Sequence, residues 1–253
     1  MNGSANVTAR FLTAEWRHLA MLNFKIDPTV LRPLVPDGTE LDDWNGQTFV
    51  SVVGFMSLNT RVLGIPIPFH RNFEEVNLRF YVRRKTTDGW RRAVVFIKEL
   101  VPRTAIALVA RLIYGEPYLA LPMKHRIHVE NDSAPAVRRV LYTWKFRGRD
   151  SRLDMNVQGE AQAIKPGSEQ EFIIEHYWGY TRRQDGTTTE YRVDHPQWRV
   201  WIATDAGFMC DTGELYGNQF VETLQRAPAS AFLADGSKVT VFKGVSLSSG
   251  RNR

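Results

Sequence analysis

The sequence predicts a mainly β protein of one domain, built on a closed or strongly curved antiparallel sheet. Apolar and polar residues alternate with period two through most of the chain. The strand-like segments are rich in β-branched and aromatic residues and end at Gly, Pro or Asp, whereas helical spacing is rare. No linker or repeat divides residues 1–253, and so long a sheet must protect its edges. We expect disordered tails at residues 1–12 and 246–253.

The alternation places the expected strands along the whole chain. The clearest strand is "EEVNLRFYVR", residues 74–83, in which one face is apolar and the other carries Glu75, Asn77, Arg79 and Tyr81. The remaining expected strands have the same composition. They are residues 18–25, 48–56, 92–100, 140–147, 171–178, 198–204 and 238–244.

Three short helices interrupt this pattern. Asp27 is a good N-cap for "DPTVLRPLV", residues 27–35, and Pro28 suits the first helical position. Residues 103–114 carry one apolar stripe and end before Gly115. A third helix is expected within residues 213–227 and ends before Pro228. After it, residues 231–242 predict a hairpin with a tight Asp-Gly turn.

Composition and charge limit the classes of function. The chain has a formal net charge of +6 and an isoelectric point near 9.5, but its arginines are scattered among acids rather than gathered with aromatics on one element. We therefore expect no nucleic-acid partner. The single cysteine, Cys210, excludes an internal disulfide and fits a reducing compartment. No apolar run approaches membrane-spanning length, so we expect a cytoplasmic protein without a membrane partner.

The polar face of residues 74–83 is the first candidate for a functional site. Inside a barrel, alternate residues point inward, and polar side chains there are either paired or exposed to a cavity. The alternative is an outward, solvated face on which Glu75 and Arg79 are cross-strand partners. The alternation by itself does not distinguish the two.

The N-terminal part resembles a known superfamily. The stretch "EWRHLAMLNFKIDPTVLRPLVPDGTELDDWNGQTFVSVVGF" is similar to acetoacetate decarboxylases, in which an active-site arginine precedes a strand, a short helix and a "VP" turn. This resemblance puts Arg17 at the position of that arginine. The later stretch "NFEEVNLRFYV" is similar to the strand that supplies an active-site glutamate, and Glu75 takes its place. The resemblance implies a closed decarboxylase-like barrel and favours an inward position for Glu75.

A narrower resemblance covers the chain from about Trp16 to Val241. The motifs "VSVVGF", "NLRFYV", "YGEPY", "EHYWGY" and "VDHPQW" follow one another as they do in the YqjF-like family of uncharacterised bacterial proteins. Each motif is weak, but five in the same order identify the chain as a member of this branch.

The resemblance does not extend to the nucleophile of the decarboxylases. That family forms a Schiff base on one of two adjacent lysines, the second of which lowers the pKa of the first. Aligned on Pro117, these positions hold Tyr118 and Leu119, and a second active-site glutamate falls near Val53. Decarboxylation by the family mechanism is therefore not expected.

Two alternative sites follow Tyr118 in "MKHRIH" and the residues after it. Lys124 is a candidate Schiff-base lysine only if it is desolvated or lies beside another cation, and the stretch otherwise reads as a basic strand edge. On a strand, His128 and Glu130 share a face while His125 points away, so a metal site would need a bulge. We expect no metal and no other cofactor.

The remaining histidines and aromatics leave their roles open. Pro196 in "HPQW" holds His195 extended, and we interpret this motif as structural. His176 and the other histidines stand far apart in sequence, so they define no site. The aromatic side chains in the last third of the chain either line a pocket or fill a wide barrel end. They include Tyr177, Trp178, Tyr180, Trp198 and Trp201.

Together these features predict a cavity that binds a small, anionic organic molecule. Arg17 and Arg79 are the expected cations, Tyr118 the hydrogen-bond donor, and Glu75 either the partner of Arg17 or a general acid/base. Any reaction would be acid/base chemistry on a keto or hydroxy acid, with Glu75 and Tyr118 as catalytic residues. The alternatives are a Schiff-base enzyme using Lys124 and an interaction protein with a vestigial cavity. A homo-oligomer is compatible with the sequence, which identifies no interface.

Overall fold

The computed structural model describes residues 9–66, 71–102, 117–130 and 137–247. In this part of the chain, strands far outnumber the helices, which are short. The strands are β1 (Arg10–Ile26), β2 (Glu40–Leu41), β3 (Thr48–Val62), β4 (Ile65–Pro66), β5 (Phe73–Thr86), β6 (Gly89–Val101), β7 (Tyr118–Ala120), β8 (Met123–Glu130), β9 (Val137–Phe146), β10 (Arg149–Gln158), β11 (Gln162–Ala163), β12 (Trp178–Arg182), β13 (Thr188–Asp194), β14 (Arg199–Met209), β15 (Ser230–Phe242) and β16 (Val245–Leu247). The α-helices are α1 (Pro28–Leu31), α3 (Glu169–Ile174), α4 (Thr212–Tyr216) and α5 (Val221–Leu224), and 3₁₀ turns are η1 (Arg32–Leu34) and η2 (Asn218–Phe220). The predicted mainly β class is confirmed.

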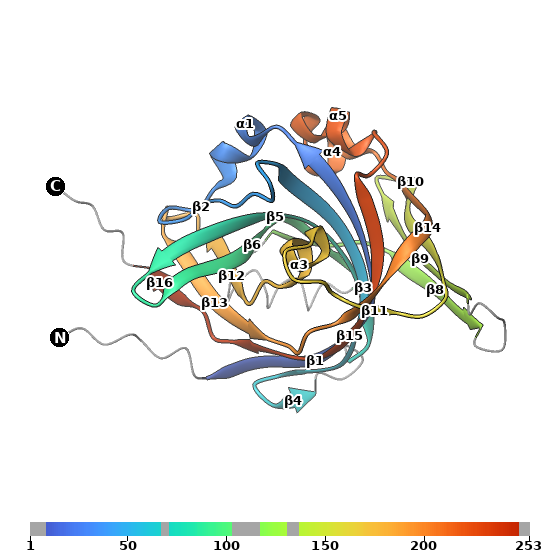
Figure 1. Cartoon of the computed structure of the whole chain (residues 1–253), viewed down its shortest axis with the longest axis horizontal. Helices are drawn as coiled ribbons and strands as arrows, with labels where there is room; N and C mark the ends of the chain where they lie inside the picture. The colour runs from blue at the N-terminus through green and yellow to red at the C-terminus, as the bar shows by residue number, and fades with distance from the viewer. Residues whose placement is uncertain (1–8, 67–70, 103–116, 131–136, 248–253) are drawn as a thin grey trace.

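The strands form a ring with a flank. The sheet runs in the order β13, β12, β6, β5, β3, β1, β15, and a further pairing of β13 with β15 closes it. The neighbours are antiparallel except β12, which runs parallel to β6. From β15 the sheet continues through β14 and β10 to β9 and β8. Figure 1 looks into the ring, with α3 inside it and β8–β10 on the right.

Two apolar clusters lie on the two faces of the ring strands. The inner cluster packs α3 against side chains such as Phe49, Tyr81 and Phe232. The outer cluster packs the opposite face of β5, for example Leu78 and Phe80, with residues of β9, β10, α4 and α5. Because both faces of β5 are covered, its polar inner face is not a solvated surface.

Two predictions about the local structure need correction. Residues 171–178 are not one strand, because α3 occupies their first half and β12 begins only at Trp178. The Ser168 hydroxyl caps α3 by accepting from the Glu171 amide, and Glu171 Oε2 accepts from the Gly167 amide at 2.6 Å. This reciprocal arrangement is close to a capping box, a signal that the apolar pattern concealed.

The prediction of an Asp-Gly hairpin is also wrong, because β15 continues through Gly236 without a turn. Gly236 has φ +76° and lies beside His18 of β1, which has φ +55°. The two left-handed residues bend the paired strands together without ending either one. The bend helps the sheet to curve into a ring.

The chain ends and the helices can be compared with their predicted positions. Asp27 caps α1 through the Thr29 amide at 2.8 Å, as predicted. Residues 10–12 belong to β1 and residues 246–247 to β16, because pairing with β15 and β13 orders these segments, so the prediction of disorder is wrong for them. Residues 1–8 and 248–253 lie outside the described residues. The helix predicted at residues 103–114 lies outside the described residues. No helix in the described ranges is both long and apolar enough to cross a membrane.

Candidate functional site

The ring encloses a cavity of about 140 Å³ beside α3. A single water molecule needs roughly 10–15 Å³, so the cavity is large enough for a small organic molecule. Aromatic side chains make up much of its wall. They include Phe11, Trp16, Phe55, Trp178, Tyr191 and Trp198.

The inner face of β5 supplies a row of polar groups to this cavity. Glu75, Asn77 and Arg79 line it, and the first two are only 7% and 2% exposed. Asn77 Nδ2 donates to Glu75 Oε1 at 3.3 Å, which orients both side chains. The solvated-face alternative is therefore wrong for this strand, because ring closure and α3 cover its polar side.

Arg79 brings positive charge to the cavity. Its Nη2 donates to the Ile173 carbonyl at 3.0 Å, which ties it to α3. Its Nε is buried and has no hydrogen-bond partner in the described part of the chain. Among the described residues, no other arginine and no lysine lines the cavity. A guanidinium with an unused N–H in a low-dielectric site is suited to binding a carboxylate.

A second carboxylate, Glu99, comes from β6 and is 1% exposed. The β5–β6 register shifts by one residue between Leu78 and Arg79, which pair with Lys98 and Phe96. This bulge lets both Phe96 and Glu99 line the cavity, although strict alternation would place them on opposite faces. Glu99 was not predicted as a site residue. The signal available in the sequence was an acidic residue within an otherwise apolar strand.

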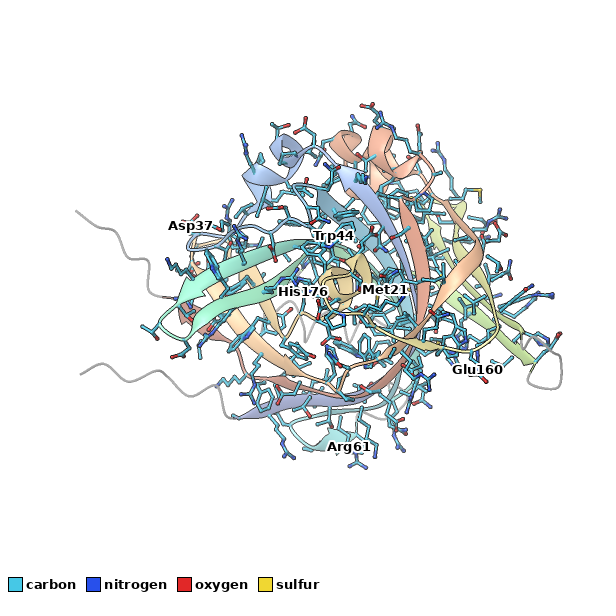
Figure 2. All side chains as sticks on the ribbon, viewed as in Figure 1. Met21, Asp37, Trp44, Arg61, Glu160 and His176 are labelled. Atoms are coloured by element: carbon cyan, nitrogen blue, oxygen red, sulfur yellow. The ribbon has the colours of Figure 1, made fainter. Side chains whose placement is uncertain are left out.

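Two histidines also reach the cavity. His176 is 6% exposed and packs against the rings of Tyr81 and Phe172, at centroid distances of 4.8 and 5.9 Å. Figure 2 shows it beside α3, within the ring. Burial lowers the pKa of His176 well below its usual value, and the nearby Arg92 and Arg79 guanidiniums lower this pKa further. The ring is therefore neutral near pH 7.

His195 lines the same cavity from the loop after β13. It stacks between Tyr177 and Trp198, at 4.8 and 4.3 Å. Burial lowers the pKa of His195 as well. The structural interpretation of "HPQW" thus accounts for the fixed stack, but not for the position of His195 on the cavity wall.

Tyr118 and Val53 also line the cavity. Tyr118 is registered against Glu99 on β6, and Glu99 against Asn77 on β5. Asn77 in turn pairs with Val53 of β3. One row across four strands therefore carries an amide, a carboxylate and a phenol into the same space.

Arg17 lies away from this group. Its guanidinium donates to the Gly236 carbonyl and pairs with Glu15 at 3.2 Å, and its side chain is 39% exposed. Trp16 lines the cavity instead. Successive strand residues point to opposite faces, so the two neighbours cannot both point inward. The expected Arg17–Glu75 partnership does not form.

Lys124 and the metal alternative lie on the flank. Lys124 is exposed on β8, which pairs with β9 beyond the ring, and it does not line the cavity. His128 contacts Glu130 at 2.6 Å, whereas His125 reaches Glu74 at 3.3 Å on the other face. Within the described residues no group of three or more His, Cys, Asp or Glu side chains has metal-site geometry.

Comparisons with known proteins place these residues in a family and a fold. Residues 13–238 match DUF2071, described as an uncharacterized conserved protein. A segment of 110 residues is 36% identical to the uncharacterized protein YqjF of Bacillus subtilis, and this match covers 43% of the chain and 44% of YqjF, less than half the length of that relative.

Solved structures extend the similarity to nearly the whole chain. The enduracididine biosynthesis enzyme MppR, in complex with pyruvate, superimposes with a TM-score of 0.66 at 14% identity, covering 97% of this chain and 93% of MppR. Acetoacetate decarboxylase of Legionella pneumophila gives the same TM-score and identity, covering 98% and 92%. At such identities the similarity establishes the decarboxylase-like fold alone.

Proposed function

The chain belongs to the DUF2071 family of uncharacterized conserved proteins, and we propose that its cavity binds a small organic anion, with Arg79 as the binding cation. The observation that carries the proposal is the buried, unpartnered Nε of Arg79 in an aromatic-walled cavity, within the described residues. Burying a cationic N–H without a partner is unfavourable, so an anionic ligand would satisfy it. MppR, which shares the fold, binds pyruvate, an anion of this kind.

Any chemistry in this cavity proceeds without a covalent amine. Every lysine of the sequence lies in the described ranges, and none lines the cavity. Glu75 and Tyr118 are the candidate acid/base groups, and Glu99 joins them. A reaction would therefore move a proton on a bound keto or hydroxy acid.

Calorimetric titration of the full chain with small keto and hydroxy acids tests this function. We expect Arg79→Met to weaken binding about 10- to 100-fold, the range for loss of a hydrogen bond to a charged group. Arg17→Ala is the matched control and should change the dissociation constant less than twofold. Equal losses in the two variants, or no binding by any acid of the panel, would rule out the assignment.

A further inference from the structure

Two motifs of the sequence have no role in anion binding by Arg79. "EHYWGY" contains His176 and "VDHPQW" contains His195, and both histidines line the cavity. They lie at the same end of the antiparallel β12–β13 pair, His176 just before β12 and His195 just after β13. What these rings do in the cavity therefore needs an explanation of its own.

His176 has hydrogen-bonding capacity that the described protein leaves unused. Both ring nitrogens are buried, and neither has a hydrogen bond of good geometry among the described residues, although hydrogen bonding to the Ile173 backbone acts to raise the pKa of the ring. The ring cannot turn freely, because Tyr81 and Phe172 contact it. A neutral imidazole presents one N–H donor and one acceptor nitrogen, so the nitrogen that does not point to Ile173 is left as an acceptor. Buried polar groups in folded proteins are nearly always satisfied, so this nitrogen indicates a partner that donates a hydrogen bond.

Two further unpartnered atoms belong to residues that line the cavity. Asn77 Oδ1 is a buried acceptor and Arg79 Nε a buried donor, again with no hydrogen bond from the described chain. The Asn77 amide is oriented by its donation to Glu75, which leaves Oδ1 as the free end. The unused groups are therefore the Arg79 donor, the Asn77 acceptor and the acceptor nitrogen of His176.

We propose that the preferred ligand is a hydroxy acid rather than a keto acid, and that His176 determines this preference. The inference rests on the proposed function, because the ligand's carboxylate binds Arg79. Its hydroxyl donates to the acceptor nitrogen of His176. A keto oxygen only accepts, so a keto acid leaves this nitrogen unpaired.

The rest of the ligand contacts the aromatic side chains of the cavity wall. His195 stacks on Trp198, whose ring meets Trp16 edge-on at a centroid distance of 6.5 Å. Such a surface favours a planar or apolar substituent on the acid. A matched pair with these features is mandelate and phenylglyoxylate, which differ only in the hydroxyl or keto group.

The test is calorimetric titration of the full-length protein with both acids at pH 7.5. We expect mandelate to bind at least tenfold more tightly than phenylglyoxylate. His176→Phe, which keeps a ring packed against Tyr81 and Phe172, should reduce this preference to less than about threefold. His176→Gln restores one donor and one acceptor and should recover part of it. The exposed His128 serves as the control, and His128→Gln should retain the full preference.

The outcomes separate the two proposals. Equal binding of the two acids, with Arg79→Met still weakening both, overturns the hydroxy-acid inference and leaves anion binding intact. A preference that persists in both His176 variants overturns the role of His176. Failure of both acids and of the wider acid panel to bind overturns anion binding and this inference together. If His176→Phe does not fold, the unmodified protein and His176→Gln decide the question.

Discussion

At the scale of single residues, burial determines the protonation of the cavity histidines. His176 is buried against two aromatic rings with cationic Arg92 and Arg79 nearby, and its burial together with these two charges disfavours the imidazolium. Arg79 is also the proposed anion site. The proposed binding cation therefore lies close to an imidazole that burial, more than any charge, keeps neutral.

The lowered pKa of His176 predicts how stability depends on pH. The unfolded chain takes up a proton near the usual pKa of 6.5, whereas the folded protein does so only well below it. The contribution of His176 is thus complete above about pH 6.5 and decreases as pH falls below that value, by up to about 1.4 kcal/mol per pH unit. Urea unfolding at pH 7.5 and 5.5 should show a smaller decrease for His176→Phe than for the unmodified protein. Parallel decreases would contradict this. His18 and His195, whose pKa values are also lowered, are present in both proteins.

At the scale of elements, α3 depends on its cap more than on its length. It has six residues, too few to be stable by itself, and its buried face is held by the ring. Arg79 donates to its Ile173 carbonyl and Arg92 lies 4.6 Å from the ring of Phe172. The cap at Ser168 therefore helps to define one wall of the cavity.

Loss of this cap should be measurable. Ser168→Ala removes the oxygen that accepts from the Glu171 amide, and we expect the free energy of unfolding to fall by about 1 kcal/mol. The exposed Ser246 of β16 is the control. Ser246→Ala should change the unfolding free energy by less than about 0.5 kcal/mol. Chemical denaturation of the two variants provides the comparison, and equal effects would exclude a capping role.

The bend shared by β1 and β15 is a second element with a specific requirement. A Cβ atom at Gly236 would lie 2.0 Å from the Trp16 carbonyl oxygen, so the backbone would have to move. We expect Gly236→Ala to destabilise the protein by more than about 2 kcal/mol. Gly38 has a similar φ, +82°, with nothing within 4 Å. Gly38→Ala should cost only about 1 kcal/mol. Thermal unfolding that ranks the two variants equally would exclude the close approach as the cause.

At the scale of the whole molecule, one buried carboxylate of β13 links β5, β6 and β12. Glu190 of β13 is 3% exposed. It accepts from Arg84 of β5 at 3.0 Å, Arg91 of β6 at 2.6 Å and the Tyr180 hydroxyl of β12 at 2.6 Å. Four strands of the ring thus share a single acceptor group. Arg91 also covers the ring of Trp178, which lines the cavity.

Removal of this carboxylate should weaken the whole ring. The two arginines are 25–29% exposed, so we expect Glu190→Ala to cost about 2–3 kcal/mol, less than for a fully buried pair. Glu222, 82% exposed and paired with Arg226, is the control. Glu222→Ala should change the unfolding free energy by less than about 0.5 kcal/mol. Denaturant titration checks both, and a loss below 1 kcal/mol for Glu190→Ala would contradict a role in linking these strands.

The mainly β class, the capped helix at Asp27 and the family could be predicted from the sequence alone. These features follow from local patterns: alternation, a cap residue and the order of short motifs. The sequence also separated the two faces of residues 74–83, and Glu75, Arg79 and Tyr118 do line the cavity. Alternation defines two faces but not which one is enclosed, because that depends on strands paired far apart in the chain.

Which residues form the cavity wall depends on the tertiary structure and could not be predicted from the sequence. The bulge opposite Arg79 brings Glu99 to the inner face, whereas strand geometry turns Trp16 inward and leaves Arg17 outside. α3 forms where the apolar pattern predicts a strand, because the cap of Ser168 and packing inside the ring favour a helix. His176 and His195 meet because β12 and β13 are adjacent in the ring. Whether a strand side chain points into the cavity depends on the closure of the ring and on its bulges, because a one-residue change in register moves the side chain to the opposite face.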